Sequence, residues 1–277
     1  MTDRNDLTWD GERGRYWAEH ADWFTRMLGD FGEAVLDRAD LRPGERVLDV
    51  GCGNGDLTVA AAQAVAPGGS VLGVDLSAEE LEVATRRAGR HDLTNVEVRQ
   101  ADAGAGDLGD QPFDVLISRF GVMFFNDPVA AFTHLHGAMA DGGRLAFACW
   151  QGLDQNPWIG RQQAVVSAIV PVPAPPPGAP GPFGLAEVDH TRGILTRAGF
   201  TDVDFESVER PVHFGADVDE AVDFIASMEW AKVTLASATE AQTDEALAAM
   251  GEALAEQAQP DGRMELPGAA WVVTARA

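Results

Sequence analysis

Short apolar runs alternate with longer amphipathic stretches along the first 150 residues of the chain. Most of these runs are rich in Val, Leu and Ile and end at a polar residue or a glycine, which is typical of strands buried in a parallel sheet. The predicted strands are Val47–Val50, Ser70–Leu76, Val96–Asp102, Phe113–Ser118 and Arg144–Trp150. Because helical stretches separate the strands, the pattern predicts an α/β protein with polar groups gathered at the carboxyl edge of a parallel sheet.

Residue types at the helix ends support this alternation. Ser77 and Glu80 form an S-x-x-E capping box, which predicts a helix starting directly behind the second strand. Asp127 as N-cap and Pro128 at the first helical position open another helix, which is expected to run to Asp141–Gly143. Each predicted helix therefore begins close to the end of a strand.

Further segments extend this core. The segment Arg13–Phe31 has an apolar stripe at helical spacing, which fits either an ordinary packed helix or a lid over a ligand. The proline-rich stretch 171–182 suits neither a helix nor a central strand, so it is either a connector or a semi-rigid flap. The remaining predicted elements are a core helix at Glu187–Ala198, a sixth strand at Thr201–Arg210, a helical segment at Asp217–Gln257 and a closing strand at Trp271–Ala275.

The first strand leads into glycines at every second position. Gly51, Gly53 and Gly55 carry no Cβ, so the backbone here can approach a ligand closely. A dinucleotide-binding loop would have another glycine where Asp56 stands, and a carboxylate at that position repels a phosphate. The loop is therefore predicted to bind a ligand that does not carry phosphates.

Acidic residues stand at the ends of the next two predicted strands. Asp75 lies 20 positions after Gly55, where a carboxylate binds a ribose diol in Rossmann-like sites. Leu76 would then lie against an adenine face. Asp102 ends the third strand. This spacing favours a ligand that contains a nucleoside.

The D-x-G-x-G-x-G sequence at 49–55 resembles motif I of the class I S-adenosylmethionine (SAM)-dependent methyltransferases. The sequence S-R-F-G-V-M-F-F-N-D-P at 118–128, with Asn156–Trp158 and Leu266–Trp271, looks most like relatives of the ubiquinone and menaquinone C-methyltransferases. The resemblance implies a Rossmann-like seven-stranded sheet of order 3-2-1-4-5-7-6, with strand 7 antiparallel. It also implies a single domain over 1–277, with a core at about 35–150, 186–213 and 266–277 and helical cap additions at about 1–34, 151–185 and 214–265.

The resemblance further implies which residues contact the cofactor and the acceptor. SAM would be bound by Asp49, Gly51, Cys52, Gly53, Asn54, Gly55, Asp75, Leu76, Asp102, Ala103 and Ser118. Within this set, Asp75 would bind the ribose and Asp102 the adenine amino group. The acceptor would contact Tyr16, Trp17, Phe120, Met123, Phe124, Trp150 and Trp158. No metal is expected.

The implied activity is methyl transfer to a small molecule, such as a secondary metabolite or a quinone-like acceptor. The reaction is an in-line displacement, so alignment and water exclusion can supply much of the catalysis. Many related O-methyltransferases place a histidine after strand four, where this chain has Phe120–Met123, so His20 is the candidate base. Arg119 could bind an anionic acceptor or form a structural ion pair. Two alternatives stay open: a SAM-binding protein with another reaction or none, and, less favoured, a nicotinamide-dependent oxidoreductase.

Composition narrows the partners and the location. The net charge of -24, from 44 acidic against 20 basic residues, argues against a nucleic-acid partner, whose phosphates need a basic surface. Cys52 and Cys149 are too few for a disulfide framework and are interpreted as buried thiols. The chain shows neither a signal-peptide pattern nor an apolar run long enough for a membrane span, so a cytoplasmic protein is expected.

Overall fold

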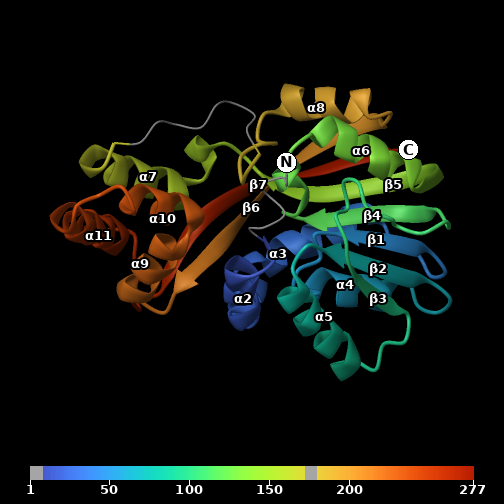
Figure 1. Cartoon of the computed structure of the whole chain (residues 1–277), viewed down its shortest axis with the longest axis horizontal. Coiled ribbons are helices and arrows are strands. Elements are labelled where there is room, and N and C mark those ends of the chain that lie inside the picture. The colour runs from blue at the N-terminus through green and yellow to red at the C-terminus, as the bar shows by residue number, and fades with distance from the viewer. Residues whose placement is uncertain (1–8, 172–179) are drawn as a thin grey trace. The chain divides into compact units, whose positions relative to one another are not determined.

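The computed structural model describes residues 9–171 and 180–277. These residues form a seven-stranded sheet of order β3-β2-β1-β4-β5-β7-β6, with β7 antiparallel to β5 (Figure 1). The strands are β1 (Arg46–Val50), β2 (Ser70–Asp75), β3 (Val96–Gln100), β4 (Phe113–Arg119), β5 (Met139–Trp150), β6 (Thr201–Gly215) and β7 (Met264–Arg276). The fold class, the strand order and the antiparallel seventh strand predicted above are confirmed.

Strand β1 is the centre of the parallel part of the sheet. It pairs with β2 on one side and with β4 on the other, and Val47, Leu48 and Val50 are fully buried. Helices cover both faces, so the strand reads as a continuous apolar run. The chain winds outward from β1 in both directions, which makes the gap between β1 and β4 the switch point of the strand order. Sheets of this kind bind ligands outside the carboxyl ends of the strands at that point.

Helices flank this sheet. The α-helices are α2 (Glu12–Glu19), α3 (Ala21–Ala39), α4 (Asp56–Ala64), α5 (Ala78–Arg90), α6 (Pro128–Gly137), α7 (Pro157–Ile169), α8 (Val188–Arg197), α9 (Val218–Ser227), α10 (Glu229–Leu235) and α11 (Glu240–Ala255). Single 3-10 turns occur at Val122–Phe124 (η1) and Leu153–Gln155 (η2). Helices α4 and α5 lie on one side of the sheet, and α6 and α8 on the other (Figure 1). No helix within the described ranges is long and apolar enough to cross a membrane.

The chain divides into two compact units. The first contains Met1–Trp150, Gly178–Val208 and Ala270–Ala277, and the second contains Gln151–Pro177 and Glu209–Ala269. Helices α2 and α3 belong to the first unit, where α2 packs on α5, and α3 packs on β4 and β5. The proposed cofactor residues all lie in this first unit.

The second unit has its own core. Helix α11 packs against α7 and α9, and the rings of Trp158 and Phe214 lie 5.2 Å apart. A buried amide, Asn156, joins its chain segments. Its side-chain oxygen accepts hydrogen bonds from the Ala269 amide and from the Trp158 indole, each at 2.9 Å. Its NH2 group donates to the carbonyls of Gln151 and Ala269 at 3.0 and 2.9 Å.

The N-terminal helix differs from its predicted form. The sequence predicts one helix over Arg13–Phe31, but α2 ends at Glu19 and α3 begins at Ala21. His20 forms the corner, and its backbone amide donates to the Tyr16 carbonyl at 3.1 Å. The apolar stripe continues through this corner because α2 and α3 both face the first unit, so periodicity alone did not reveal the break.

The boundary between α6 and β5 was also predicted wrongly. The helix ends at Gly137, six residues before the predicted limit at Gly143. The next residues already belong to β5, where Met139 pairs with Phe113 before the register shifts. Asp141–Gly143, interpreted as a helix stop, therefore interrupts a strand. Strands β6 and β7 are also longer than predicted. Residues 172–179 of the proline-rich stretch lie outside the described residues.

Loss of the Asn156 side chain should destabilise the protein. Asn156→Ala leaves several buried polar groups without partners, which should lower the free energy of unfolding by roughly 2–4 kcal/mol. Urea denaturation measures the change. Asp154→Ala, at an exposed position two residues earlier, is the control and should change stability by less than about 0.5 kcal/mol. Equal stability of the two variants would contradict this role of Asn156.

Candidate functional site

The loop between β1 and α4 lies at the switch point of the sheet. Gly51 and Gly55 have φ values of 66° and 77°, in the left-handed region that favours glycine. Neighbouring backbone also excludes a side chain at both positions. A Cβ on Gly51 would lie 2.8 Å from the Gly121 Cα, and one on Gly55 would lie 2.6 Å from the Ala84 Cβ. These glycines thus allow the loop to pack closely against α5 and the end of β4. The same lack of a Cβ would let a ligand approach the backbone.

Asp49 is a buried carboxyl just before this loop. One of its oxygens accepts a hydrogen bond from the Thr58 hydroxyl at 2.6 Å. The other, Oδ1, has no hydrogen-bond partner among the described residues. Burial raises the pKa of Asp49 to about 7, with the Thr58 hydrogen bond opposing the shift. The site therefore contains a buried acceptor that can take a hydrogen bond from a ligand.

Asp75 holds the glycine loop against the end of β2. Its Oδ2 accepts from the Gly53 amide at 2.8 Å, and its Oδ1 accepts from the Ser77 amide at 3.0 Å. Burial raises the pKa of Asp75, and these backbone hydrogen bonds act in the opposite direction. Each carboxylate oxygen can accept a second hydrogen bond, so Asp75 keeps capacity for a ribose hydroxyl.

The predicted capping box forms only in part. The Ser77 hydroxyl accepts from the Glu80 amide at 3.2 Å, as expected at the N-cap of α5. The reciprocal bond from Glu80 is absent, because Asp75 already accepts from the Ser77 amide. The Glu80 carboxylate lies instead against Gly53, where its Oε1 is 3.0 Å from the position of a Cβ on that glycine. Glu80 is not among the cofactor residues predicted from the sequence.

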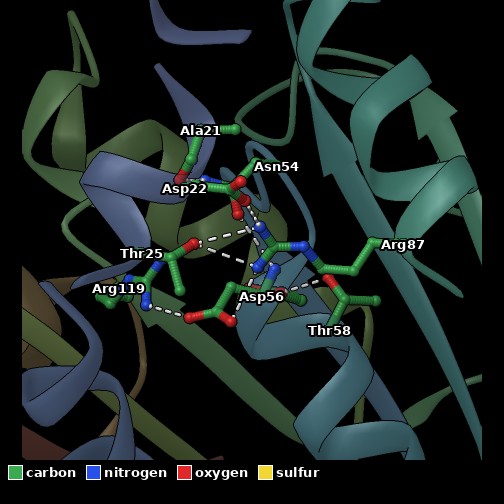
Figure 2. A network of polar contacts seen from close by, with 9 residues as sticks. Ala21, Asp22, Thr25, Asn54, Asp56, Thr58, Arg87 and Arg119 are labelled. Carbon is green, nitrogen blue, oxygen red and sulfur yellow. Dashed lines mark hydrogen bonds and ion pairs between the residues drawn. The ribbon is translucent and has the colours of Figure 1, made fainter. Parts of the chain in front are cut away.

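A network of ion pairs surrounds the start of α4 (Figure 2). The Asp56 carboxylate accepts from Arg119 at 2.7 Å and from Arg87 at 2.8 Å. Arg87 also donates to the Thr25 hydroxyl on α3 at 3.1 Å, and the Asn54 amide group donates to the Ala21 carbonyl at 3.2 Å. The network therefore joins the glycine loop to α3, α5 and the end of β4.

This network changes two interpretations of the sequence. Of the two alternatives for Arg119, the structure contains the ion pair, and the arginine side chain is only 10% exposed. Asp56 is paired with two guanidinium groups, so the premise of a bare carboxylate that repels phosphate was wrong. The charge of Asp56 therefore does not exclude a dinucleotide from this loop.

The other proposed cofactor residues have varied surroundings. The Ser118 hydroxyl donates to the Val50 carbonyl at 2.7 Å and accepts from the Gly121 amide, which links β4 to β1. Asp102 is exposed, and its Oδ1 accepts from the Gly104 amide at 2.7 Å. Ala103 is buried, Leu76 is half-buried, and the thiol of Cys52 is buried with a raised pKa. A thiol in such surroundings stays protonated and unreactive.

Aromatic residues cluster beside the end of β4. The rings of Phe120 and Trp150 stack at 4.2 Å, and the Phe31 ring meets them edge-on at 5.5 and 5.2 Å. Phe120 has a φ of 61°, which is strained for a bulky residue. Met123 is buried nearby in the chain. Strain of this kind persists only where the surrounding structure enforces it.

The proposed residues of the N-terminal helices make local contacts. The Trp17 ring stacks on Phe24 at 3.6 Å, and the Tyr16 ring lies 4.3 Å from the His20 ring. The Nδ1 of His20, an exposed residue, is 2.7 Å from the Tyr16 carbonyl oxygen. Phe124 packs edge-on against Trp9, with 5.0 Å between ring centroids. Trp158, also proposed as an acceptor contact, is buried in the second unit.

Comparison with known proteins supports this description. Residues 41–166 match the family model described as a methyltransferase domain. The chain is 32% identical over 126 residues to aklanonic acid methyltransferase DauC of Streptomyces sp. (strain C5), which covers 46% of this chain and 56% of that protein. It is also 32% identical over 127 residues to demethylmenaquinone methyltransferase of Staphylococcus aureus (strain JH9), which covers 46% of this chain and 48% of that protein. The matched part thus spans about half of each relative.

A solved structure shows the same fold. The chain superposes on phosphoethanolamine N-methyltransferase 2 of Haemonchus contortus, solved in complex with SAM, with a TM-score of 0.59 and 19% identity. The match covers 100% of this chain and 60% of the other. The predicted resemblance to the SAM-dependent methyltransferases is confirmed, with residues 41–166 similar to a methyltransferase domain. This matched segment contains the glycine loop, Asp75, Glu80 and Arg119.

The buried Asp49 carboxyl predicts an unusual pH dependence of stability. Its pKa is raised from 3.8 to about 7, so between these values the folded protein binds more protons than the unfolded chain. The contribution of Asp49 to stability is therefore present at low pH and is lost as the pH rises through about 7. Asp49→Asn removes this titration. Its stability relative to the wild-type protein should therefore rise by up to about 4 kcal/mol between about pH 4 and pH 8.

Chemical denaturation of both proteins without ligand at the two pH values measures this difference. Asp110→Asn is the control, since Asp110 is exposed and its replacement should give the same difference from wild type at both pH values. If Asp49→Asn behaved like this control, the assigned burial of an ionisable Asp49 would be wrong.

Proposed function

We propose that the protein is a SAM-dependent methyltransferase that transfers a methyl group to a small-molecule acceptor. The observation that carries the proposal is the methyltransferase-domain match over residues 41–166, which includes the whole β1–α4 loop. Two sequence relatives with methyltransferase names, 32% identical over 126 and 127 residues, support the same activity.

The residues at the switch point fit SAM on structural grounds. The Oδ1 of Asp49 is a buried acceptor without a partner among the described residues, and so can receive a hydrogen bond from the ligand. The loop after it combines close backbone packing with acids, which suits a ligand with a positively charged sulfonium and few anionic groups. The proposed cofactor contacts are Asp49, Gly51, Cys52, Gly53, Asn54, Gly55, Asp75, Leu76, Asp102, Ala103 and Ser118.

When bound, SAM supplies a methyl carbon that its sulfonium has already activated for displacement. The protein then has to align the acceptor and keep water away. Good alignment can contribute about 7–11 kcal/mol to the lowering of the barrier. The stacked rings of Phe120 and Trp150, with Phe31 edge-on to both, form a buried apolar cluster beside the end of β4, and the acceptor is proposed to align against this cluster.

The proposed catalytic residues have different roles. His20 is exposed at the corner between α2 and α3 and is the proposed base for an acceptor that must lose a proton. Arg119 acts through its ion pair with Asp56, so we assign it the positioning of the glycine loop. A role in binding an anionic acceptor would require this ion pair to open.

The proposed acceptor is a small molecule, such as a secondary metabolite or a quinone-like compound. The names of the two sequence relatives refer to aklanonic acid and to demethylmenaquinone. The further proposed contacts in the first unit are Tyr16, Trp17, Met123 and Phe124. The net charge of -24 disfavours a nucleic-acid acceptor, because phosphates are repelled by an acidic surface.

Incubation with methyl-labelled SAM tests the proposal. The purified protein is mixed with labelled cofactor and a panel of phenolic and quinone compounds, and transfer of label is followed by mass spectrometry. A labelled product supports methyl transfer, and its fragmentation identifies the carbon, oxygen or nitrogen that was methylated. Tight binding of S-adenosylhomocysteine without a labelled product from this panel or from metabolite extracts would favour a SAM-binding protein with another reaction.

Removal of the Asp75 carboxylate should weaken cofactor binding. Asp75→Ala is expected to raise the dissociation constant of S-adenosylhomocysteine at least tenfold, or about 1.4 kcal/mol, because a ribose hydroxyl loses its charged acceptor. Isothermal titration calorimetry measures the constant. Asp110→Ala, which removes an exposed acid, is the control and should bind like the wild-type protein. An unchanged constant for Asp75→Ala would remove the ribose assignment.

A further inference from the structure

Glu80 is a charged residue on the apolar face of α5. The buried residues of this helix are Glu80, Leu81, Ala84 and Ala88, so Glu80 occupies a core position. It is only 4% exposed. Glutamate is rarely buried to this degree unless it is paired. The other acids of the helix, Glu79 and Glu82, are in ion pairs with Arg15 and Arg86.

The Glu80 carboxylate has no donor of its own. Within the described parts of the chain no hydrogen bond reaches its side-chain oxygens, and its backbone amide donates to the Ser77 hydroxyl. The carboxylate lies against the Cα of Gly53, in the middle of the glycine loop. A buried carboxyl without partners is unfavourable for folding, so this position calls for another explanation than stability.

Charged groups around Glu80 come from several elements. Asp75 at the end of β2 and Glu79 on α5 disfavour its ionised form, whereas Arg119 and Arg13 favour it. These arginines are engaged elsewhere, because Arg119 is paired with Asp56, and the Arg13 guanidinium lies 3.8 Å from the centre of the Trp9 ring. Burial first, and then the nearby Asp75, raise the pKa of Glu80 well above its ordinary value. In the protein without ligand Glu80 is thus held in its neutral form over a wider pH range than an exposed glutamate.

Asp75 and Glu80 differ in the number of hydrogen bonds that their carboxylates already accept. Both Asp75 oxygens already accept backbone hydrogen bonds, from Gly53 and Ser77. Glu80 accepts none, so its full acceptor capacity is available to a ligand on the glycine loop. We propose that Glu80 is a second acidic cofactor-binding residue, which accepts a hydrogen bond from a ribose hydroxyl beside Asp75 and becomes ionised when the cofactor binds. This inference rests on the proposed function.

Ionisation on binding has a measurable consequence. Where Glu80 is protonated in the ligand-free protein, formation of the complex releases its proton. The affinity for the cofactor should therefore increase as the pH rises toward the raised pKa of Glu80, in addition to any contribution from Asp49, whose pKa is raised to about 7. Glu80→Gln removes the contribution of Glu80 to this pH dependence and leaves the contribution of Asp49.

The test is calorimetric titration of S-adenosylhomocysteine and of SAM into the wild-type protein, Glu80→Gln and Glu79→Gln. Each titration is repeated in two buffers with different ionisation enthalpies, so that proton release is counted. Glu80→Gln should bind both ligands about tenfold more weakly and release fewer protons, because a charged acceptor is lost. Glu79→Gln is the matched control, with the same change of charge one residue away, and should behave like the wild-type protein.

Thermal unfolding without ligand separates binding from a structural role. Since an unpaired buried carboxyl destabilises the empty protein, Glu80→Gln and the apolar variant Glu80→Met should unfold at an equal or higher temperature than wild type while their stabilisation by ligand decreases. Lower stability of both empty variants, or failure of both to fold, would make Glu80 structural and overturn the inference.

Three further outcomes would overturn the inference or the proposed function. Unchanged binding and proton release in Glu80→Gln would overturn the inference but leave the proposed function intact. A loss confined to SAM would place Glu80 near the sulfonium and overturn its assignment to the ribose. Absence of S-adenosylhomocysteine and SAM binding by the wild-type protein would overturn the proposed function, and this inference with it.

Discussion

The carboxylate of Asp56 is the point on which the geometry of the site depends. It begins α4 directly after the glycine loop and accepts hydrogen bonds from Arg87 and Arg119, whose side chains are 14% and 10% exposed. The Asp56 side chain is 28% exposed, and its removal would leave both guanidinium groups without their shared carboxylate. Since Arg87 also contacts Thr25, the same interaction fixes α3 relative to the loop. The position of the N-terminal helices and the shape of the loop are therefore coupled.

Other acids around the loop are not neutralised in this way. Asp49, Asp75 and Glu80 all have pKa values raised by burial, and Asp49 and Glu80 each retain unused acceptor capacity. An enzyme core could be more stable with apolar residues at these positions. Proteins commonly give up stability at sites where a ligand supplies the missing interactions. Asp56 and Asp75 therefore hold the loop in place, and Asp75 keeps acceptor capacity as well. Asp49 and Glu80 have side-chain oxygens without a hydrogen-bond partner in the described structure, and these oxygens are proposed to bind the cofactor.

Much of the fold could be predicted from local pattern. Buried strands such as β1 read as apolar runs because helices cover both faces of the sheet, and the order of the strands followed from a family resemblance that begins at the same loop. The prediction was wrong where the same sequence pattern is compatible with two different local structures. The apolar stripe of α2 continues into α3 through the corner at His20, and the glycines at 142–143 interrupt a strand although they resemble a helix stop. Periodicity reports which face is buried and does not report where the chain bends.

The site was harder to predict because its partners are distant in sequence. The choice between two roles for Arg119 depended on Asp56, which lies 63 positions earlier. Glu80 was assigned to a capping box from a three-residue spacing, but the Ser77 amide it needed is bound by Asp75. The apolar face of α5 did carry the relevant signal, since an acid stands there among Leu81, Ala84 and Ala88. That signal was in the sequence, but the local motif offered a simpler explanation.

Close packing explains why the acid at position 80 has to face the loop. The Cα of Gly55 approaches Ala84 so tightly that no side chain fits between them, which fixes the distance of α5 from the loop. Glu80 lies one helical turn before Ala84, a step of about 6 Å along the axis. Gly53 lies two residues before Gly55, in a turn closed by the hydrogen bond from the Gly55 amide to the Cys52 carbonyl at 2.9 Å. The same close approach of α5 to the loop brings Glu80 against Gly53, where its Oε1 is 3.0 Å from the position of a Cβ.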